Sequence, residues 1–397
     1  MKRSGATHAW PAAVAFAVNG GLYGGMLSRY AEIAAGAHAE AVAFGVALTT
    51  GALGGLAGSI LAPLVMRVCS EQITMVMVGL AYAVFSVALP LAPNPSVLAA
   101  AFFMIGAADG AHDVSMNALT VRYQQRLRLP LMGRLHALWS LALAAGAALG
   151  AAAAALGVAP ALHLGIAAAI LGTTQLLASR STRCTGSIID EPGAAIEPGA
   201  GNAHRFTLAG ARGLLVMIVV AAIAASYIEG PGQDWSAIVL ADAFAADTGT
   251  AAAAPFAFSL GLLISRLLLD PLRRRFSASR IATAAAALVA VGGLNGLLAA
   301  HLHAPAPLAL ATLVLIGFGA GPIYPMLFDT ANTLGSRHRI SPATTAGIIS
   351  TCSRIGAITA PVLVGQLAHT AGLGVVLTVI ATAGILSLIT LPRALRP

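Results

Sequence analysis

Long apolar segments dominate this sequence and limit the folds that it can adopt. Twelve of them, each at least 20 residues long, alternate with shorter stretches that contain charged residues, Pro or Gly. A helix of about 20 apolar residues spans the hydrocarbon core of a bilayer. The composition agrees, since 58% of the residues are hydrophobic and 9% are charged, with a mean hydropathy of +0.85, outside the range of soluble domains. We therefore predict an all-α membrane protein with transmembrane helices at residues 9–29, 41–66, 73–92, 97–121, 134–157, 160–179, 213–240, 249–269, 280–300, 307–328, 342–368 and 371–392.

The basic residues indicate how these helices are oriented. Of the 22 Lys and Arg residues, all but Arg29, Arg266 and Arg354 lie on one side of the twelve-span arrangement. Cytoplasmic loops carry such an excess, so we expect a multi-pass protein of the inner (plasma) membrane with both termini in the cytoplasm. The net charge of +8 then reflects topology. A nucleic-acid partner is not expected, because the basic residues are spread over short loops instead of one soluble face.

The sequence divides into two related halves. Residues 181–205 form a long polar stretch with Gly and Pro, which predicts a cytoplasmic linker between an N-terminal bundle at 1–180 and a C-terminal bundle at 206–397. Pro63 aligns with Pro271 and Gly106 with Gly317, in equivalent spans of the two halves. We therefore predict twelve transmembrane helices in two pseudo-symmetric six-helix bundles, related by an axis along the membrane normal.

The fourth span carries polar residues that an apolar helix does not need. Asp109, Asp113 and Asn117 are spaced four apart and project from one face toward a common space. Ionisable residues at membrane depth are costly, which makes them candidates for function. Asp113 is the principal candidate for binding and releasing a proton, with Asp109 as a relay or packing partner. The alternative for Asp113 is a permanent ion pair with a nearby arginine; Asn117 could contact substrate or another helix.

The seventh span contains a second polar group near the bilayer midplane. Glu229 precedes Gly230-Pro231-Gly232, which must interrupt helical hydrogen bonding because Pro lacks an N–H. Interrupted helices at this depth often border a binding cavity. Glu229 is thus a candidate coupling or binding residue. Asp234 is a candidate gate residue or helix cap, and Trp235 either stacks on a ligand or anchors the helix at the membrane interface.

The arginines within the spans complete the candidate site. Arg354 is interpreted as a counter-ion for Asp113 or for an anionic substrate, with a structural pair as the alternative. Arg266 lies four residues before Asp270, a spacing that predicts a local ion pair at the cytoplasmic gate. Tyr324 and Asn19 are candidates for lining the cavity by their position in the sequence.

Four motifs carry a family resemblance: GAADGAHDVSMNA at 106–118, PLMGRLHALWS at 130–140, IEGPGQDWSAIVL at 228–240 and GFGAGPIYPMLF at 317–328. They resemble the major facilitator superfamily and, within it, the fucose and sugar permease-like branch. The resemblance implies a twelve-helix carrier that alternates access around a midplane site, often driven by protons. It implies that Asp113 and Asn117 occupy the proton-coupling pattern of the fourth helix, that Arg67 is the retained residue of the gate loop after the second helix, and that Asn19 stands in a first helix where relatives tend to have a carboxylate.

These observations favour a secondary active transporter of a small polar solute, sugar-like or related, that works by alternating access and is coupled to protons. An exporter of drugs, siderophores or other metabolites is the alternative, and a non-transporting membrane sensor is a second one. We expect a monomer in the lipid bilayer whose partners are its substrate and protons. No enzyme activity is expected, because the sequence lacks HExxH, GxSxG and phosphate-loop motifs. The isolated Cys69, Cys184 and Cys352 indicate no metal site, and no cofactor is expected.

Overall fold

The computed structural model describes residues 10–129, 131–183, 212–329 and 342–395, and these are helical without strands. The first half contains α1 (Trp10–Leu27), α2 (Tyr30–Gly36), α3 (Ala41–Val68), α4 (Glu71–Ala88), a 3-10 turn (Leu89–Leu91), α5 (Pro95–Leu127), α6 (Met132–Ala155) and α7 (Pro160–Arg183). The second half contains α8 (Arg212–Gly230), a π turn (Pro231–Trp235), α9 (Ser236–Ala243), α10 (Thr248–Ala252), α11 (Ala254–Arg273), α12 (Ala278–His301), α13 (Ala306–Ala320), α15 (Pro342–Ala371) and α16 (Val375–Ala394).

The long helices confirm the predicted membrane architecture. Among the described residues, 11 helical stretches are long and apolar enough to cross a bilayer. α1 is the remaining long helix of the first half, and it packs along α6 and α7. Each predicted segment coincides with one of these helices, with ends that differ by a few residues. The predicted linker lies outside the described residues from residue 184 onward.

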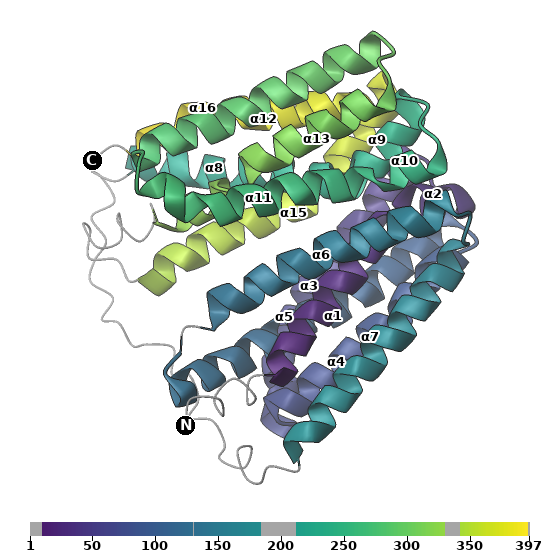
Figure 1. The fold of residues 1–397 in the computed structure, drawn as a ribbon, viewed down its shortest axis with the longest axis vertical. Coiled ribbons are helices and arrows are strands. Elements are labelled where there is room, and N and C mark those ends of the chain that lie inside the picture. Colours follow the sequence, from purple (N-terminus) through teal and green to yellow (C-terminus); the bar gives the residue numbers. More distant parts are fainter. Residues whose placement is uncertain (1–9, 130, 184–211, 330–341, 396–397) are drawn as a thin grey trace.

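The two halves form separate bundles that meet at one end (Figure 1). At this end, hereafter the contact end, α2 of the first half lies beside α9 and α10 of the second half. The bundles diverge toward the opposite end, where α7 stops and α15 starts (Figure 1). Close backbone packing holds the contact end together, because a Cβ at Gly45 would overlap the carbonyl of Pro361, and one at Gly249 would meet Ala155.

Within each half, glycines bring equivalent helix pairs into backbone contact. A Cβ at Gly106 of α5 would overlap the carbonyl of Gly51 on α3, and one at Gly317 of α13 would overlap the carbonyl of Phe258 on α11. Small residues permit this approach in lipid, where no hydrophobic force drives helices together. Gly106 and Gly317 are the residues that the internal repeat aligned, so the two halves use the same packing device at matching positions.

Arg29 has an unexpected position for a basic residue on the outer side of the predicted topology. Its side chain is fully buried between α1 and α2. The guanidinium donates to Oε1 of Glu32 at 2.9 Å and to the carbonyl of Val158 at 2.5 Å. Burial lowers the pKa of Arg29 and raises that of Glu32, while the ion pair opposes both shifts. The guanidinium thereby fastens α2 to the loop between α6 and α7.

Candidate functional site

A cavity of about 260 Å³ lies between the two halves. The volumes of small-molecule sites in proteins range from about 300 to about 1,000 Å³. This cavity lies slightly below the lower end of that range, so it suits a compact solute. α1 and α6 line it from the first half, and α8, the π turn, α11, residues near the end of α13 and α15 line it from the second half. The lining residues are Tyr23, Trp139, Ser140, Leu143, Ser226, Glu229, Gly230, Pro231, Gln233, Asp234, Trp235, Ser259, Leu262, Arg266, Tyr324, Ala357, Ala360 and Pro361.

The Gly-Pro-Gly sequence shapes one wall of the cavity. Hydrogen bonding of the helical type is interrupted there, as predicted, but the chain does not leave the helix: α8 widens into one π turn and continues as α9. Pro231 supplies no N–H, and such π turns occur frequently at functional sites. The wider turn places Gln233, Asp234 and Trp235 beside Glu229 in the wall. Gly232 fits because the ring of Phe258 occupies the space where a side chain would lie.

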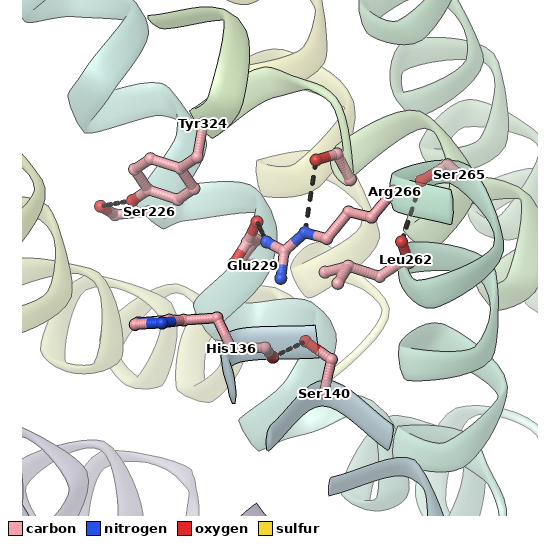
Figure 2. A network of polar contacts seen from close by, with 9 residues as sticks. His136, Ser140, Ser226, Glu229, Leu262, Ser265, Arg266 and Tyr324 are labelled. Atoms are coloured by element: carbon pink, nitrogen blue, oxygen red, sulfur yellow. Dashed lines mark hydrogen bonds and ion pairs between the residues drawn. The ribbon is translucent and has the colours of Figure 1, made fainter. Parts of the chain in front are cut away.

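An ion pair crosses the second half within this wall. Arg266 of α11 donates to Oε1 of Glu229 on α8 at 3.2 Å, and its Nε donates to the carbonyl of Gly321 at 3.4 Å (Figure 2). The predicted local pair between Arg266 and Asp270 was therefore wrong. Asp270 is exposed, where water screens its charge, whereas the partly buried carboxylate of Glu229 gains more from a cation.

Hydroxyl groups and aromatic rings complete the lining. The hydroxyls of Tyr324 and Ser226 lie 2.8 Å apart (Figure 2). Ser226 donates to the carbonyl of Ser353 at 2.9 Å. Two buried polar atoms of the lining residues have no hydrogen-bond partner within the described structure: Nε1 of Trp235 and Oγ of Ser259. Buried polar groups are nearly always paired. These two are thus unused hydrogen-bonding groups at the cavity.

Trp235 and Asp234 also join the two halves at the contact end. The hydroxyl of Tyr23 on α1 donates to Oδ1 of Asp234 at 3.1 Å. The ring of Trp235 lies edge-on to Phe44 of α3, with centroids 5.4 Å apart, and only 1% of its surface is exposed. The interfacial-anchor alternative for Trp235 is therefore wrong, because the indole packs inside the protein. Asp234 takes part in an inter-half hydrogen bond, which is the geometry expected of a gate residue.

The acidic residues of α5 lie outside the lining of this cavity. Asp113 accepts a 2.9 Å hydrogen bond from Nδ2 of Asn117, and the basic residues that face it are His136 of α6 and Arg354 of α15. No ion pair within 4.0 Å involves Asp113 in the part of the chain that the structure describes. Arg354 reaches Oγ of Ser59 on α3 at 3.5 Å. Arg354 of the second half thus approaches Asp113 of the first half but, within the described residues, forms no ion pair with it.

The side chain of Asp109 points toward α1 and not toward His136 and Arg354, the basic residues near Asp113. It accepts a hydrogen bond from Asn19 of α1 at 2.7 Å, inside the first bundle. The predicted common space for Asp109, Asp113 and Asn117 is therefore divided, because the side chain of Asp109 turns to α1. Asn19 is 4% exposed and touches the cavity only through its bond to Trp139. Arg67 is exposed in the last turn of α3.

His112 is a polar residue that sequence reasoning missed, as it missed Tyr23 and Ser226 of the cavity lining. His112 is fully buried on α5, and its two ring nitrogens lie 3.3 Å from Nδ2 of Asn19 and 3.2 Å from Nε2 of Gln175 on α7. The signal was present, since a titratable residue in the middle of an apolar span invites the same reasoning as Asp109. Its position one turn from Asp109 places both on the side of α5 that meets α1.

Comparisons with known proteins agree with one another. A sequence model described as the Major Facilitator Superfamily matches residues 9–361. The chain is 29% identical over 329 residues to the uncharacterized transporter y4wD of Sinorhizobium fredii, covering 80% of this chain and 81% of that protein. It is 26% identical over 302 residues to an uncharacterized MFS-type transporter of Yersinia pestis, covering 75% and 73%.

Solved structures share the fold at low sequence identity. The nucleoside transporter NupG superposes with a TM-score of 0.68 at 12% identity, covering 97% of each chain. A bacterial homologue of the human lysosomal transporter Spinster, in an inward-facing and unoccupied conformation, superposes with a TM-score of 0.67 at 12% identity, covering 100% of this chain and 96% of that one. At this identity the likeness concerns the fold.

Proposed function

The chain belongs to the major facilitator superfamily, and on this premise we propose that it is a proton-coupled secondary transporter of a small, polar, sugar-like solute that binds in the cavity between the two bundles. Its multi-pass membrane architecture and its kinship with transporters are the ground for this proposal. The single observation that carries the solute class is the chemistry of the cavity, which combines hydrogen-bonding side chains with aromatic faces in a small volume.

The cavity lining fits an uncharged ring compound better than an anion. Glu229 and Arg266 neutralise each other, which leaves Asp234 as the remaining carboxylate among the lining residues. The ring centroids of Tyr23 and Trp139 lie 6.4 Å apart, with an interplanar angle of 25°. Aromatic faces of this kind pack against the C–H face of a sugar or stack on the flat face of a nucleobase. The volume of about 260 Å³ speaks against bulky drugs and siderophores. Export of a small metabolite remains the alternative direction.

Asp113 is the proposed principal coupling carboxylate. Asn117 can hydrogen-bond it in either protonation state, because an amide offers both a donor and an acceptor. The absence of an ion pair within 4.0 Å among the described residues leaves Asp113 free to exchange a proton, and His136 and Arg354 face it. Glu229 is engaged by Arg266, so it is the secondary candidate, and Asp109 is a relay member.

The proposed orientation places the contact end outside the cytoplasm. With both termini and the 181–205 linker cytoplasmic, the structure has its outer end closed. This orientation rests on the distribution of basic residues. An impermeant thiol reagent added to intact cells should then leave Cys184 unmodified. Modification of Cys184 from outside the cell would contradict the proposed orientation.

A thermal-shift screen of the purified protein tests the solute class. Neutral monosaccharides, nucleosides, hydroxycarboxylates and siderophores are compared, since a ligand that binds the folded state raises the melting temperature. We expect stabilisation by a neutral sugar or nucleoside, lost in Glu229→Gln and retained in the matched control Asp270→Asn, whose carboxylate is exposed and does not line the cavity. Stabilisation by siderophores alone would favour the exporter alternative.

A further inference from the structure

A buried polar network joins the cavity wall to the interior of the first bundle. Nε1 of Trp139, a cavity-lining residue of α6, donates to Oδ1 of Asn19 on α1 at 2.6 Å. Nδ2 of Asn19 donates to Oδ1 of Asp109 at 2.7 Å and lies 3.3 Å from Nδ1 of His112. Tyr23 lies one turn along α1 from Asn19, and its ring stacks against the ring of Trp139. Asn19 therefore connects a lining indole to two titratable groups that the solute cannot reach.

The indole fixes the direction in which the Asn19 amide points. An indole N–H can only donate, so the amide oxygen must face Trp139 and the amide N–H groups must face Asp109 and His112. Asp109 consequently acts as an acceptor. A neutral His112 accepts at only one of its ring nitrogens, from Asn19 at Nδ1 or from Gln175 at Nε2. The orientation follows from donor and acceptor chemistry and not from the naming of amide atoms.

The surroundings of His112 leave Asp109 as the group that takes up a proton. Nε2 of His112 lies 3.2 Å from Nε2 of Gln175, an amide nitrogen that donates to the carbonyl of Met75 at 2.8 Å. Gln175 fits there because Gly79 has no side chain. A second ring proton on His112 would place donors against the amide nitrogens of both Asn19 and Gln175, so the network favours a neutral ring. Asp109 meets no such obstacle, because a protonated carboxyl group still contains an acceptor.

We propose that Asn19 is a positioning residue through which the protonation state of Asp109 sets the position of the Trp139 indole in the cavity wall. The inference rests on the proposed function, in which solute binds against Trp139. As a carboxylate, Asp109 holds the amide by a charge-assisted hydrogen bond, which keeps Oδ1 turned to the indole. Protonated Asp109 accepts more weakly, and its O–H can donate to Asn19 only when the amide turns over. That turn removes the acceptor from Trp139 and releases the indole.

The other titratable groups around Asp109 define what the test must control. On α5 these are Asp113 and His112; Tyr82 faces it from α4 and Tyr30 from α2. α1, α3 and α6 present no further titratable group to it among the described residues, and His136 of α6 faces Asp113. Tyrosines are neutral over the relevant range. Asp113 is thus the one other carboxylate whose titration could reach Asp109, and its variant is the matched control.

The test is acrylamide quenching of Trp139 fluorescence in the purified full-length protein, in a Trp10→Phe background. Trp235 is 1% exposed and poorly reached by acrylamide, and Trp139→Phe assigns the remaining signal. We expect quenching to change between about pH 5 and about pH 8, where groups of this kind titrate. The change should be lost in Asp109→Asn and in Asn19→Ala and kept in Asp113→Asn. Where Asp109→Asn gives no cooperative melting transition, Asn19→Ala decides, since it leaves both titratable groups in place.

Three outcomes would overturn the proposal: quenching in the parent protein that does not vary over this range, a pH dependence that persists in Asn19→Ala, or one that disappears in Asp113→Asn. The measurement needs neither a solute nor transport. A pH-dependent indole in a protein that moves no protons would leave this inference standing and remove the proton coupling of the proposed function. Proton-coupled transport with an unresponsive indole would do the reverse.

Discussion

The hydroxyl of Tyr23 in the first half donates a 3.1 Å hydrogen bond to Oδ1 of Asp234 in the second half. Both side chains line the cavity, and the bond lies beside the contact between Phe44 and Trp235. Any movement that separates the halves at the contact end must break it. The pair therefore couples the lining of the cavity to the closure of that end.

Removing this hydroxyl should loosen the contact end. In Tyr23→Phe, Asp234 loses its donor, and leaving a buried polar group without a hydrogen-bond partner costs about 1–3 kcal/mol. We expect a cysteine introduced at Ala357, in a background without native cysteines, to be labelled from the contact end faster than in the parent protein. Tyr227→Phe is the control, because its hydroxyl bonds Thr359 within the second half. Equal labelling of the two variants would show that the Tyr23 bond does not hold the halves.

The ion pair in the cavity wall should show coupling between its members. Arg266→Gln leaves the carboxylate of Glu229 without its cation, at a cost between the roughly 1 kcal/mol of an exposed pair and the roughly 3 kcal/mol of a buried one. The double variant Glu229→Gln/Arg266→Gln should melt at a higher temperature than Arg266→Gln. Additive losses in this double-mutant cycle would mean that the two side chains act independently.

A glycine of the internal repeat should be intolerant of a methyl group. In Gly106→Ala the new Cβ would overlap the carbonyl of Gly51, so α3 and α5 must separate and lose packing. A lower melting temperature is expected. Gly133→Ala supplies the comparison, since no atom lies within 4 Å of its Cβ position and Ala favours a helix over Gly by up to about 1 kcal/mol. If both substitutions change stability alike, close helix contact at Gly106 is not required.

The buried Arg29 should be essential for the stability of the contact end. Arg29→Ala leaves Glu32 and the carbonyl of Val158 without their donor, and breaking a buried pair costs about 3–5 kcal/mol. Arg29→Lys should recover only part of the loss, because one ammonium cannot reproduce the fork of a guanidinium. Thermal unfolding in detergent measures both, with Arg126→Ala, an exposed residue, as control. Full stability in Arg29→Lys would reduce its role to a single charge.

The sequence predicted the helices and the repeat because both depend on patterns that lie within single segments. The apolar length of each span and the alignment of Gly106 with Gly317 are visible without knowing any neighbour. The partner of Arg266 could not be predicted, because Glu229 is distant along the chain and only the packing of α8 on α11 brings them together, whereas Asp270 was available at helical spacing. His112 itself was visible as a titratable residue within an apolar span, but its partners Asn19 and Gln175 could not be predicted, because they come from α1 and α7 and the sequence does not state which face of α5 meets them.

The central claim is that Asp113 carries the coupled proton, and transport in proteoliposomes tests it most directly. The solute that stabilises the protein is supplied to wild type and to Asp113→Asn, which keeps the size and hydrogen bonding of the side chain but cannot titrate. We predict that solute-driven proton movement vanishes in the variant while exchange of solute across the membrane continues. Proton movement at the wild-type rate in Asp113→Asn would contradict the account and assign Asp113 a structural role.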